Sequence, residues 1–212
     1  MKTIYLVRHG ESVINVSDKY EQNSDSPLTE NGEKQAARIA DRATRLKFDA
    51  LIASPFLRTK QTAELIAKAT GKTIEFHSEF QEREMPHSIV GKAKLDEVAK
   101  ATVEAAFLSS VTRNPKIGEA ETFDELVARA DKALEILKSH SSDSILVVGH
   151  GFFTRILIAR MLYGDAFSPE IFEPFSWGLR TRNTGLSVIH FNPEDTHRTW
   201  WLSVWNDHAH LA

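Results

Sequence analysis

Two histidines lie beside glycine directly after short apolar runs of the chain. His9 follows the run 2–7 within Arg8-His9-Gly10, and His150 follows the run 144–148 within Gly149-His150-Gly151. Each run is predicted to be a buried strand that ends at its histidine. If the two strands are neighbours in a parallel sheet, both imidazoles lie over the same sheet edge. A neutral imidazole at that edge could attack phosphorus, because its free pKa of about 6.5 leaves much of it uncharged at pH 7.

Two arginines lie near these histidines in the predicted topology. Arg8 directly precedes His9, and Arg58 follows the apolar run that ends at Ser54. A guanidinium is permanently charged, and its forked N–H donors match the geometry of a phosphate group. The two arginines therefore predict a site for a phosphate ester.

A carboxyl group is needed to give a proton to the leaving oxygen of such an ester. General acid catalysis of this kind raises the rate by ~10² to 10⁴. Glu82 lies in the polar stretch after the third predicted strand, where it can enter the site. Glu84 lies two residues further on, and Glu79 is a more distant competitor. The residues alone leave the choice between these carboxylates open.

Four segments of the chain resemble, in order, the signature segments of the histidine phosphatase superfamily, the phosphoglycerate-mutase-like proteins. The similarity covers residues 3 to about 160. The segments are Leu6-Val7-Arg8-His9-Gly10-Glu11-Ser12 with Asn15, Ser26-Pro27-Leu28-Thr29-Glu30-Asn31-Gly32, Ser54-Pro55-Phe56-Leu57-Arg58-Thr59-Lys60-Gln61-Thr62-Ala63, and Val147-Val148-Gly149-His150-Gly151.

This resemblance implies a role for each matching residue. It implies that His9 is the nucleophile and that Glu82, through the pair Glu82-Arg83, is the acid. The residues that it implies for holding the phosphoryl group are Arg8, Asn15, Arg58, His150 and Gly151.

The expected chemistry is a two-step transfer with no metal and no cofactor. Arg8, Arg58 and a protonated His150 would hold the charge on the equatorial oxygens of the transition state. Glu82 would protonate the leaving oxygen and then take a proton from the water that attacks the phosphohistidine.

The stretch after Glu82-Arg83 favours a phosphatase over a mutase. It reads Glu84-Met85-Pro86-His87, without the Tyr-Gly turn and the Lys- and Arg-rich run of the glycolytic mutases that the family contains. The predicted cap also has few cations, so the leaving group need not be strongly anionic. These cations are Lys92, Lys94, Lys100, Arg113 and Lys116.

Three other functions are weighed against the phosphatase. A phosphoglycerate-type mutase would pass the phosphoryl group to a sugar acid instead of water. A phosphate-binding module without turnover would not need both histidines, both arginines and an acid. A metal hydrolase built on His9, His150 and Glu82 has no paired-histidine motif of recognisable spacing in its favour.

Strands alternate with helices along the chain. Strands are predicted at 2–7, 49–54, 73–77, 144–148, 186–191 and 199–205, and helices at 28–47, 57–71, 95–111, 122–140 and 152–163, with residues 11–27 polar and turn-rich. The pattern predicts an α/β fold in which a mostly parallel sheet has helices on both faces, a three-layer α/β/α arrangement. Residues 1–212 are predicted to be a single domain with a small helical cap insertion at about 79–118.

Composition excludes several classes of partner. The 212 residues carry 26 Lys and Arg against 29 Asp and Glu, and contain no Cys. This balance gives no electrostatic case for nucleic acid or an anionic membrane surface, and no apolar run reaches the ~18 residues of a membrane span. A cytoplasmic protein is expected, acting on a small phosphorylated substrate or a phosphoprotein. The natural substrate and the choice between monomer and homodimer stay open.

Some conspicuous residues are expected to be structural. The tryptophans of the last strand, Trp200, Trp201 and Trp205, are interpreted as core or as a dimer contact. His208 and His210 lie near the terminus and are expected to be solvated. Arg129 is interpreted either as a brace for the His150 strand or as a surface residue.

Overall fold

A six-stranded mixed sheet forms the centre of the structure, a computed structural model that describes residues 1–21 and 24–212. The strand order is β3-β2-β4-β1-β5-β6. The first four strands in this order run parallel, whereas β5 is antiparallel to both of its neighbours. The strands are β1 (Lys2–Arg8), β2 (Ala50–Ala53), β3 (Ile74–Phe76), β4 (Ser144–Gly149), β5 (Leu186–Phe191) and β6 (Trp200–Asp207).

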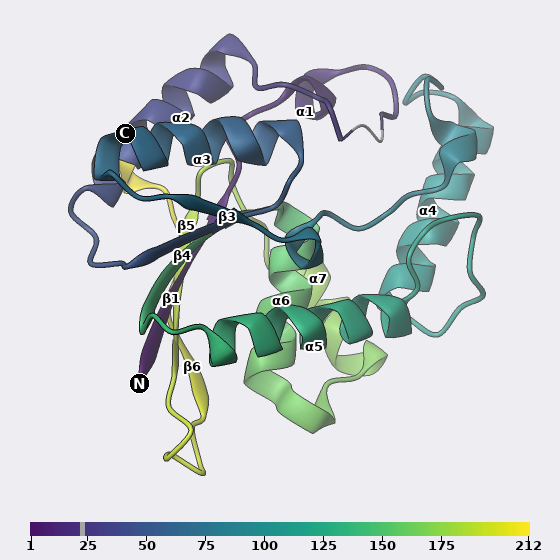
Figure 1. Cartoon of the computed structure of the whole chain (residues 1–212). Coiled ribbons are helices and arrows are strands. Elements are labelled where there is room, and N and C mark those ends of the chain that lie inside the picture. Colours follow the sequence, from purple (N-terminus) through teal and green to yellow (C-terminus); the bar gives the residue numbers. More distant parts are fainter. Residues whose placement is uncertain (22–23) are drawn as a thin grey trace.

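Helices cover both faces of this sheet (Figure 1). The α-helices are α1 (Val13–Val16), α2 (Glu30–Ala43), α3 (Leu57–Thr70), α4 (Glu97–Val111), α5 (Phe123–Ser139), α6 (Gly151–Tyr163) and α7 (Pro169–Gly178). Helices α2 and α3 pack on one face, and α5 and α6 pack on the other. The predicted three-layer α/β/α fold is confirmed.

Alternating side chains of the central strands build two separate cores. Ile145 and Val147 of β4 belong to the cluster under α5 and α6, whereas Leu146 and Val148 belong to the cluster under α2 and α3. Successive residues of a strand point to opposite faces, so a strand covered on both sides is apolar at every position. The unbroken apolar run of β4 is therefore a consequence of its place between two helical layers.

Two helices were not predicted, and a third is shorter than expected. Helix α1 lies in the stretch predicted to be turn-rich, of which residues 22–23 lie outside the described residues. Helix α7 begins at Pro169 and contains Pro174, and the two prolines conceal its helical period. Helix α2 has the predicted N-cap, since the Thr29 hydroxyl accepts from the Gly32 N–H, but it ends at Ala43 rather than near residue 47. Tight turns that bond back to Asp41 and Arg42 end it there.

The segment between β3 and α5 lies to one side of the sheet and contains the predicted cap. It consists of two 3₁₀ turns, Ser78–Phe80 and His87–Ile89, and helix α4. Helix α4 contacts α5 and α7 (Figure 1). The position of this segment matters because it forms one wall of the pocket described below. Its status as an insertion into a single domain stays a prediction.

The end of the chain packs more closely than expected. Trp200 and Trp205 pack against the core cluster under α6, as predicted, and Trp201 stacks on His190. His210 is half-buried rather than fully solvated: its Nε2 lies 3.0 Å from the Thr184 hydroxyl, and burial lowers its pKa to about 4. Within the described residues, no helix is long and apolar enough to cross a membrane.

Candidate active site

His9 and His150 meet at the carboxyl edge of the sheet. Strands β1 and β4 are parallel neighbours, with Arg8 paired to Gly149, so their carboxyl ends lie side by side. The two imidazole centroids are 5.2 Å apart, and the residues are 3% and 0% exposed. The predicted neighbourhood of the two histidines is confirmed.

The hydrogen bonds around the two rings assign the proton on each neutral imidazole. His9 Nδ1 lies 2.6 Å from the Gly10 carbonyl oxygen, which can only accept, so Nδ1 carries the proton. His9 Nε2 is then a lone pair, and Arg58 Nε donates to it at 3.2 Å. His150 has the opposite tautomer, because Arg58 Nη2 can only donate to its Nδ1, at 3.2 Å. Its Nε2–H therefore donates to Ser54 Oγ at 2.8 Å.

Both histidines are neutral at pH 7. Burial, followed by the positive charge of Arg58, holds the pKa of His9 well below 6.5, and the same causes act in the same order on His150. A neutral His150 fits this arrangement, since a second positive charge beside Arg58 in a dry site is unfavourable. Protonation of His150 beside a bound phosphoryl group stays a prediction. The permanent positive charges of the site are those of Arg8 and Arg58. Burial lowers the pKa of Arg58 to about 10, which leaves it charged at neutral pH.

Arg8 packs against the start of helix α6. Its Nη1 donates to the Thr181 carbonyl at 2.7 Å, and its buried Nε has no partner in the part of the chain that the structure describes. A Cβ on Gly151 would lie 3.3 Å from that Nε and 2.9 Å from Thr181 Oγ1, so glycine permits the approach. Gly151 is the first residue of α6, where helix geometry gives the N–H no intrahelical acceptor. The Arg8 guanidinium and the N-terminus of α6 therefore lie close together.

The loop that carries His9 is locked by close backbone packing against α2 and α3. A Cβ on Gly10 would lie 2.5 Å from the Gly32 carbonyl oxygen, and a Cβ on Gly32 would overlap the carbonyl oxygen of Glu11. The Gly10 N–H donates to Thr62 Oγ1 at 3.1 Å, and that hydroxyl donates to the Arg58 carbonyl at 2.7 Å. Thr62 thus connects the loop of His9 to the helix of Arg58.

Asn15 supports the same loop. Its Oδ1 accepts from the Ser12 N–H at 3.1 Å and from Asn183 Nδ2 at 3.2 Å. Asn183 Nδ2 also donates to the His9 carbonyl at 3.0 Å. Asn183 had no sequence signal, because it follows none of the predicted strands. The contact of Asn15 with phosphate stays a prediction.

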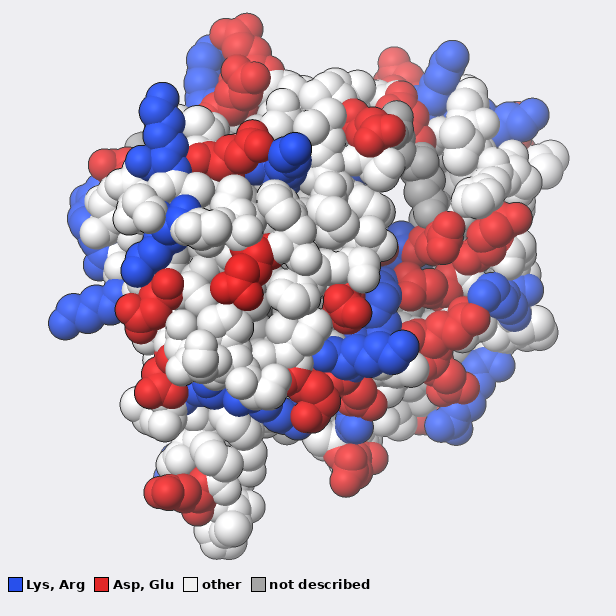
Figure 2. Space-filling view, viewed as in Figure 1, with Lys and Arg blue, Asp and Glu red and all other residues white. Residues whose placement is uncertain are grey.

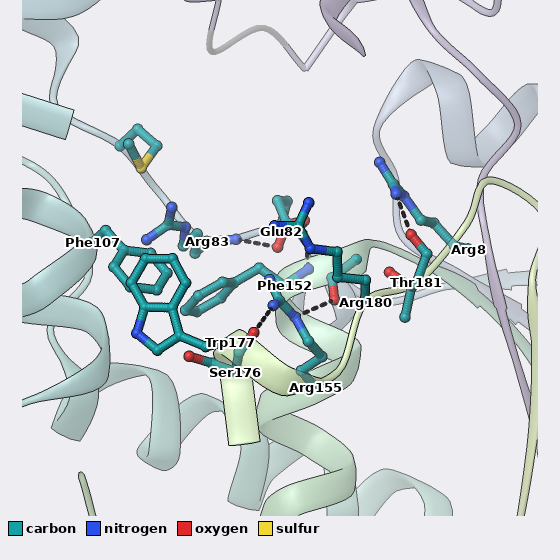
Figure 3. Close-up of a pocket in the computed structure, with 12 residues that line it drawn as sticks. Arg8, Glu82, Arg83, Phe107, Phe152, Arg155, Ser176, Trp177, Arg180 and Thr181 are labelled. Carbon is teal, nitrogen blue, oxygen red and sulfur yellow. Dashed lines mark hydrogen bonds between the residues drawn. The ribbon is translucent and has the colours of Figure 1, made fainter. Parts of the chain in front are cut away.

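Glu82 lies against the N-terminus of α6 and lines the same pocket as Arg8 (Figure 3). Its Oε2 accepts from the Phe152 N–H at 3.0 Å, and its Oε1 accepts from the Phe153 N–H at 2.9 Å. Glu84 instead faces His87 at 3.4 Å on the exposed surface. Of the carboxylates that the sequence left open, Glu82 is the one that lines the pocket.

Arg129 holds the segment that carries Glu82, rather than the strand of His150. Its Nη1 donates to the carbonyls of Glu79 and Gln81 at 3.1 and 2.7 Å. Its Nη2 is paired with Glu121 at 2.6 Å. The backbone on the N-terminal side of Glu82 is therefore fixed by a half-buried ion pair, which neither interpretation from the sequence included.

A pocket of about 470 Å³ opens from Arg8 and Glu82 (Figure 3). Helices α4, α6 and α7 supply half of its lining residues. Residues in it that the sequence did not connect to the site include Phe107, Arg155, Ser176, Trp177 and Arg180. Three guanidinium groups beyond Arg8, those of Arg83, Arg155 and Arg180, lie in this wall. The sequence-based count of cations included only those of the cap and left these three arginines out. The charge of the leaving group stays a prediction.

Two further features of the described residues concern the charge of the surface and the capacity to bind a metal. On the face shown in Figure 2, Lys and Arg side chains are interspersed with Asp and Glu side chains. Within residues 1–21 and 24–212, no group of three or more His, Cys, Asp and Glu residues is arranged to hold a metal ion.

The chain is similar to known proteins in both sequence and fold. The sequence profile of the histidine phosphatase superfamily (branch 1) matches residues 4–208. A Salmonella arizonae protein named "Probable phosphoglycerate mutase GpmB" is 32% identical over 209 residues, which cover 97% of this chain and 90% of that protein. The alpha-ribazole phosphatase of Shigella flexneri has a similar fold, with a TM-score of 0.80, 23% identity and coverage of 98% of this chain and 97% of that chain. The mycobacterial glucosyl-3-phosphoglycerate phosphatase bound to VO₃ has a TM-score of 0.78 at 18% identity, covering 97% and 99% of the two chains.

Proposed function

Because this chain belongs to the histidine phosphatase superfamily, we propose that it is a phosphomonoesterase that works through a phosphohistidine on His9. The observation that carries the proposal is the lone pair on His9 Nε2, which faces Arg58 in a site where the imidazole is neutral. Phosphate monoester hydrolysis needs accelerations of up to ~10²¹, so nucleophile, charge stabilisation and proton transfer must act together.

In the first step His9 Nε2 forms a bond to phosphorus while the bond from phosphorus to the ester oxygen breaks. Arg8 and Arg58 hold the charge on the equatorial oxygens, with the Gly151 N–H as a further donor. Nδ1 of neutral His150 is a hydrogen-bond acceptor, and so are the phosphoryl oxygens. Nδ1 therefore orients the Arg58 guanidinium rather than the phosphoryl group. Glu82, in its protonated form, gives its proton to the leaving oxygen, and the alcohol departs into the adjoining pocket.

In the second step a water molecule attacks the phosphohistidine. Glu82, now a carboxylate, takes a proton from that water as its oxygen bonds to phosphorus. The bond between phosphorus and Nε2 breaks, which restores neutral His9 and releases inorganic phosphate. Glu82 is suited to this exchange because it is only partly buried and lines the pocket.

A phosphoglycerate-type mutase is the second candidate, and the name of the 32% identical relative favours it. The two functions differ in the acceptor of the phosphoryl group, which is water in one and a sugar acid in the other. Two features support water: a pocket of about 470 Å³ that admits solvent to Glu82, and the Glu84-Met85-Pro86-His87 stretch that departs from the glycolytic mutases.

The test is hydrolysis of p-nitrophenyl phosphate by the wild type and by His9→Ala, in EDTA. The phosphatase proposal expects turnover in EDTA that is lost in His9→Ala and kept in His197→Ala, a matched change at an exposed histidine. The second arm adds 3-phosphoglycerate and separates inorganic phosphate from isomerised product. Isomerisation without phosphate release supports the mutase, and phosphate binding without any turnover supports the binding module.

A further inference from the structure

We propose that the pocket beside the phosphoryl site selects esters whose alcohol carries both a flat ring and a second anionic group, a carboxylate or a phosphate. Arg83 and Arg180 would bind the anion, and Trp177 with Phe107 would contact the ring. This inference rests on the proposed phosphatase activity and assigns the leaving group that the activity would release.

The charge in the pocket exceeds what the transferred phosphoryl group needs. The wall carries four guanidinium groups and one carboxylate, in a chain whose net charge is −3. A phosphate monoester dianion is matched by Arg8 and Arg58 in the phosphoryl site. The three other arginines of the wall carry three positive charges, and Glu82 carries one negative charge. The pocket therefore has an excess of positive charge that a second anion would neutralise.

The guanidinium of Arg155 is already hydrogen-bonded to backbone carbonyls. The candidates for binding an anion are therefore Arg83 and Arg180. Arg155 Nη1 donates to the carbonyls of Ser176 and Leu179, and its Nε donates to the Gly151 carbonyl at 3.3 Å. These bonds satisfy carbonyl groups at the C-terminal end of α7. Arg155 is therefore a positioning residue that holds the end of α7, and with it Trp177 and Arg180, against α6 (Figure 3).

Arg83 packs against aromatic rings in the pocket wall and also feels the charges of Glu82 and Glu121. Its guanidinium carbon lies 4.2 Å from the centroid of Phe152 and 5.3 Å from that of Phe107. Its enclosed Nη1 has no hydrogen-bond partner in the described part of the chain. Burial lowers the pKa of Arg83 to about 10, so the group is still a cation at neutral pH. A half-buried cation with an enclosed, unsatisfied N–H donor is stabilised by an incoming anion.

The aromatic wall fits a flat ring. Trp177 is 58% exposed although it is among the largest apolar side chains, and its ring centroid lies 4.6 Å from that of Phe107 at an interplanar angle of 53°. An exposed tryptophan braced by a second ring is a typical contact for another ring, since stacking adds to the area that it buries. A volume of about 470 Å³ also exceeds what a three-carbon acid fills.

The test compares four esters in EDTA: 4-carboxyphenyl phosphate, its neutral isostere 4-carbamoylphenyl phosphate, 1,4-phenylene bisphosphate and glycerol 3-phosphate. We expect the wild type to prefer the carboxylate over the carbamoyl ester by at least about tenfold in kcat/KM. Arg180→Gln should reduce that preference to less than about threefold. The exposed residue Arg182 lies outside this pocket, and Arg182→Gln should leave the preference unchanged.

Two further readouts complete the test. Trp177→Ala should lower kcat/KM for the three aryl esters relative to glycerol 3-phosphate, and the bisphosphate shows whether the anion site takes a phosphate as well as a carboxylate. Equal kcat/KM for the carboxylate and carbamoyl esters in the wild type, or a preference that survives in Arg180→Gln, would overturn the inference. Absence of turnover with all four esters would instead overturn the phosphatase proposal on which it rests.

Discussion

Ser54 sets the tautomer of His150, and its replacement by alanine tests the hydrogen-bond pattern of the site. Both residues are fully buried, and the Ser54 hydroxyl is the acceptor for His150 Nε2–H at 2.8 Å. In Ser54→Ala that N–H is left unsatisfied in a dry site, which costs about 1–3 kcal/mol in the free energy of unfolding. For a chain of 212 residues this corresponds to a fall in Tm of about 2–12 °C.

The same substitution should lower activity through Arg58. The His150 ring can avoid the unsatisfied N–H only by moving its proton to Nδ1, which would then oppose the Arg58 Nη2 donor. Displacing a charged donor from the phosphoryl site costs about 1.5–3 kcal/mol, or roughly a 10- to 100-fold fall in kcat/KM.

Thermal unfolding and p-nitrophenyl phosphate kinetics measure both effects. Ser139→Ala, at a serine whose hydroxyl bonds an exposed helix carbonyl, should leave Tm and kcat/KM close to the wild type. The assigned tautomer is wrong if Ser54→Ala matches the wild type in both measurements.

Three further changes probe other parts of the account. Glu82→Gln should slow turnover of p-nitrophenyl phosphate by about 10²- to 10⁴-fold and give a burst of p-nitrophenolate. The burst is expected because p-nitrophenolate leaves without an acid, whereas the attacking water still needs a base. Glu84→Gln, at an exposed carboxylate, should show neither effect. Gly32→Ala should lower the free energy of unfolding by at least about 1–3 kcal/mol in urea titrations, because its Cβ overlaps the Glu11 carbonyl oxygen, and a wild-type midpoint would contradict that packing. Because burial and Arg58 hold the pKa of His9 well below 6.5, the unfolded chain binds a proton that the folded chain does not. The free energy of unfolding is therefore highest above about pH 6.5. Below that pH it falls by about 1.4 kcal/mol per pH unit for each such histidine. The fall should be less steep in His9→Ala, and a fall as steep as in the wild type would refute this reasoning.

The sheet and the meeting of His9 with His150 were predictable from local patterns. The apolar run of β4 and its place before Gly149-His150-Gly151 indicate a buried strand with a site at its end, and the parallel pairing of β1 with β4 then brings His9 and His150 together. Local signals also sufficed for the start of α2, where Thr29 forms the N-cap.

The rest depends on contacts between distant segments. Helix α7 was missed because Pro174 interrupts its period, and without α7 the pocket wall at Trp177 and Arg180 has no place in a sequence-based prediction. The neutral state of His150 follows from its burial and from Arg58, which no single segment reveals. The C-terminal His210 likewise finds its partner Thr184 only in the folded chain.

In the proposed mechanism His9 Nε2 carries the phosphoryl group, and a rapid-quench experiment can trap this intermediate. The enzyme is mixed with p-nitrophenyl phosphate in EDTA, quenched in alkali within the first turnover, and its peptides are analysed by mass spectrometry. We expect an acid-labile, alkali-stable phosphoryl group on the peptide that contains His9, formed fast enough to support steady-state turnover. Turnover that proceeds without this adduct, or that persists in His9→Ala, would contradict this mechanism.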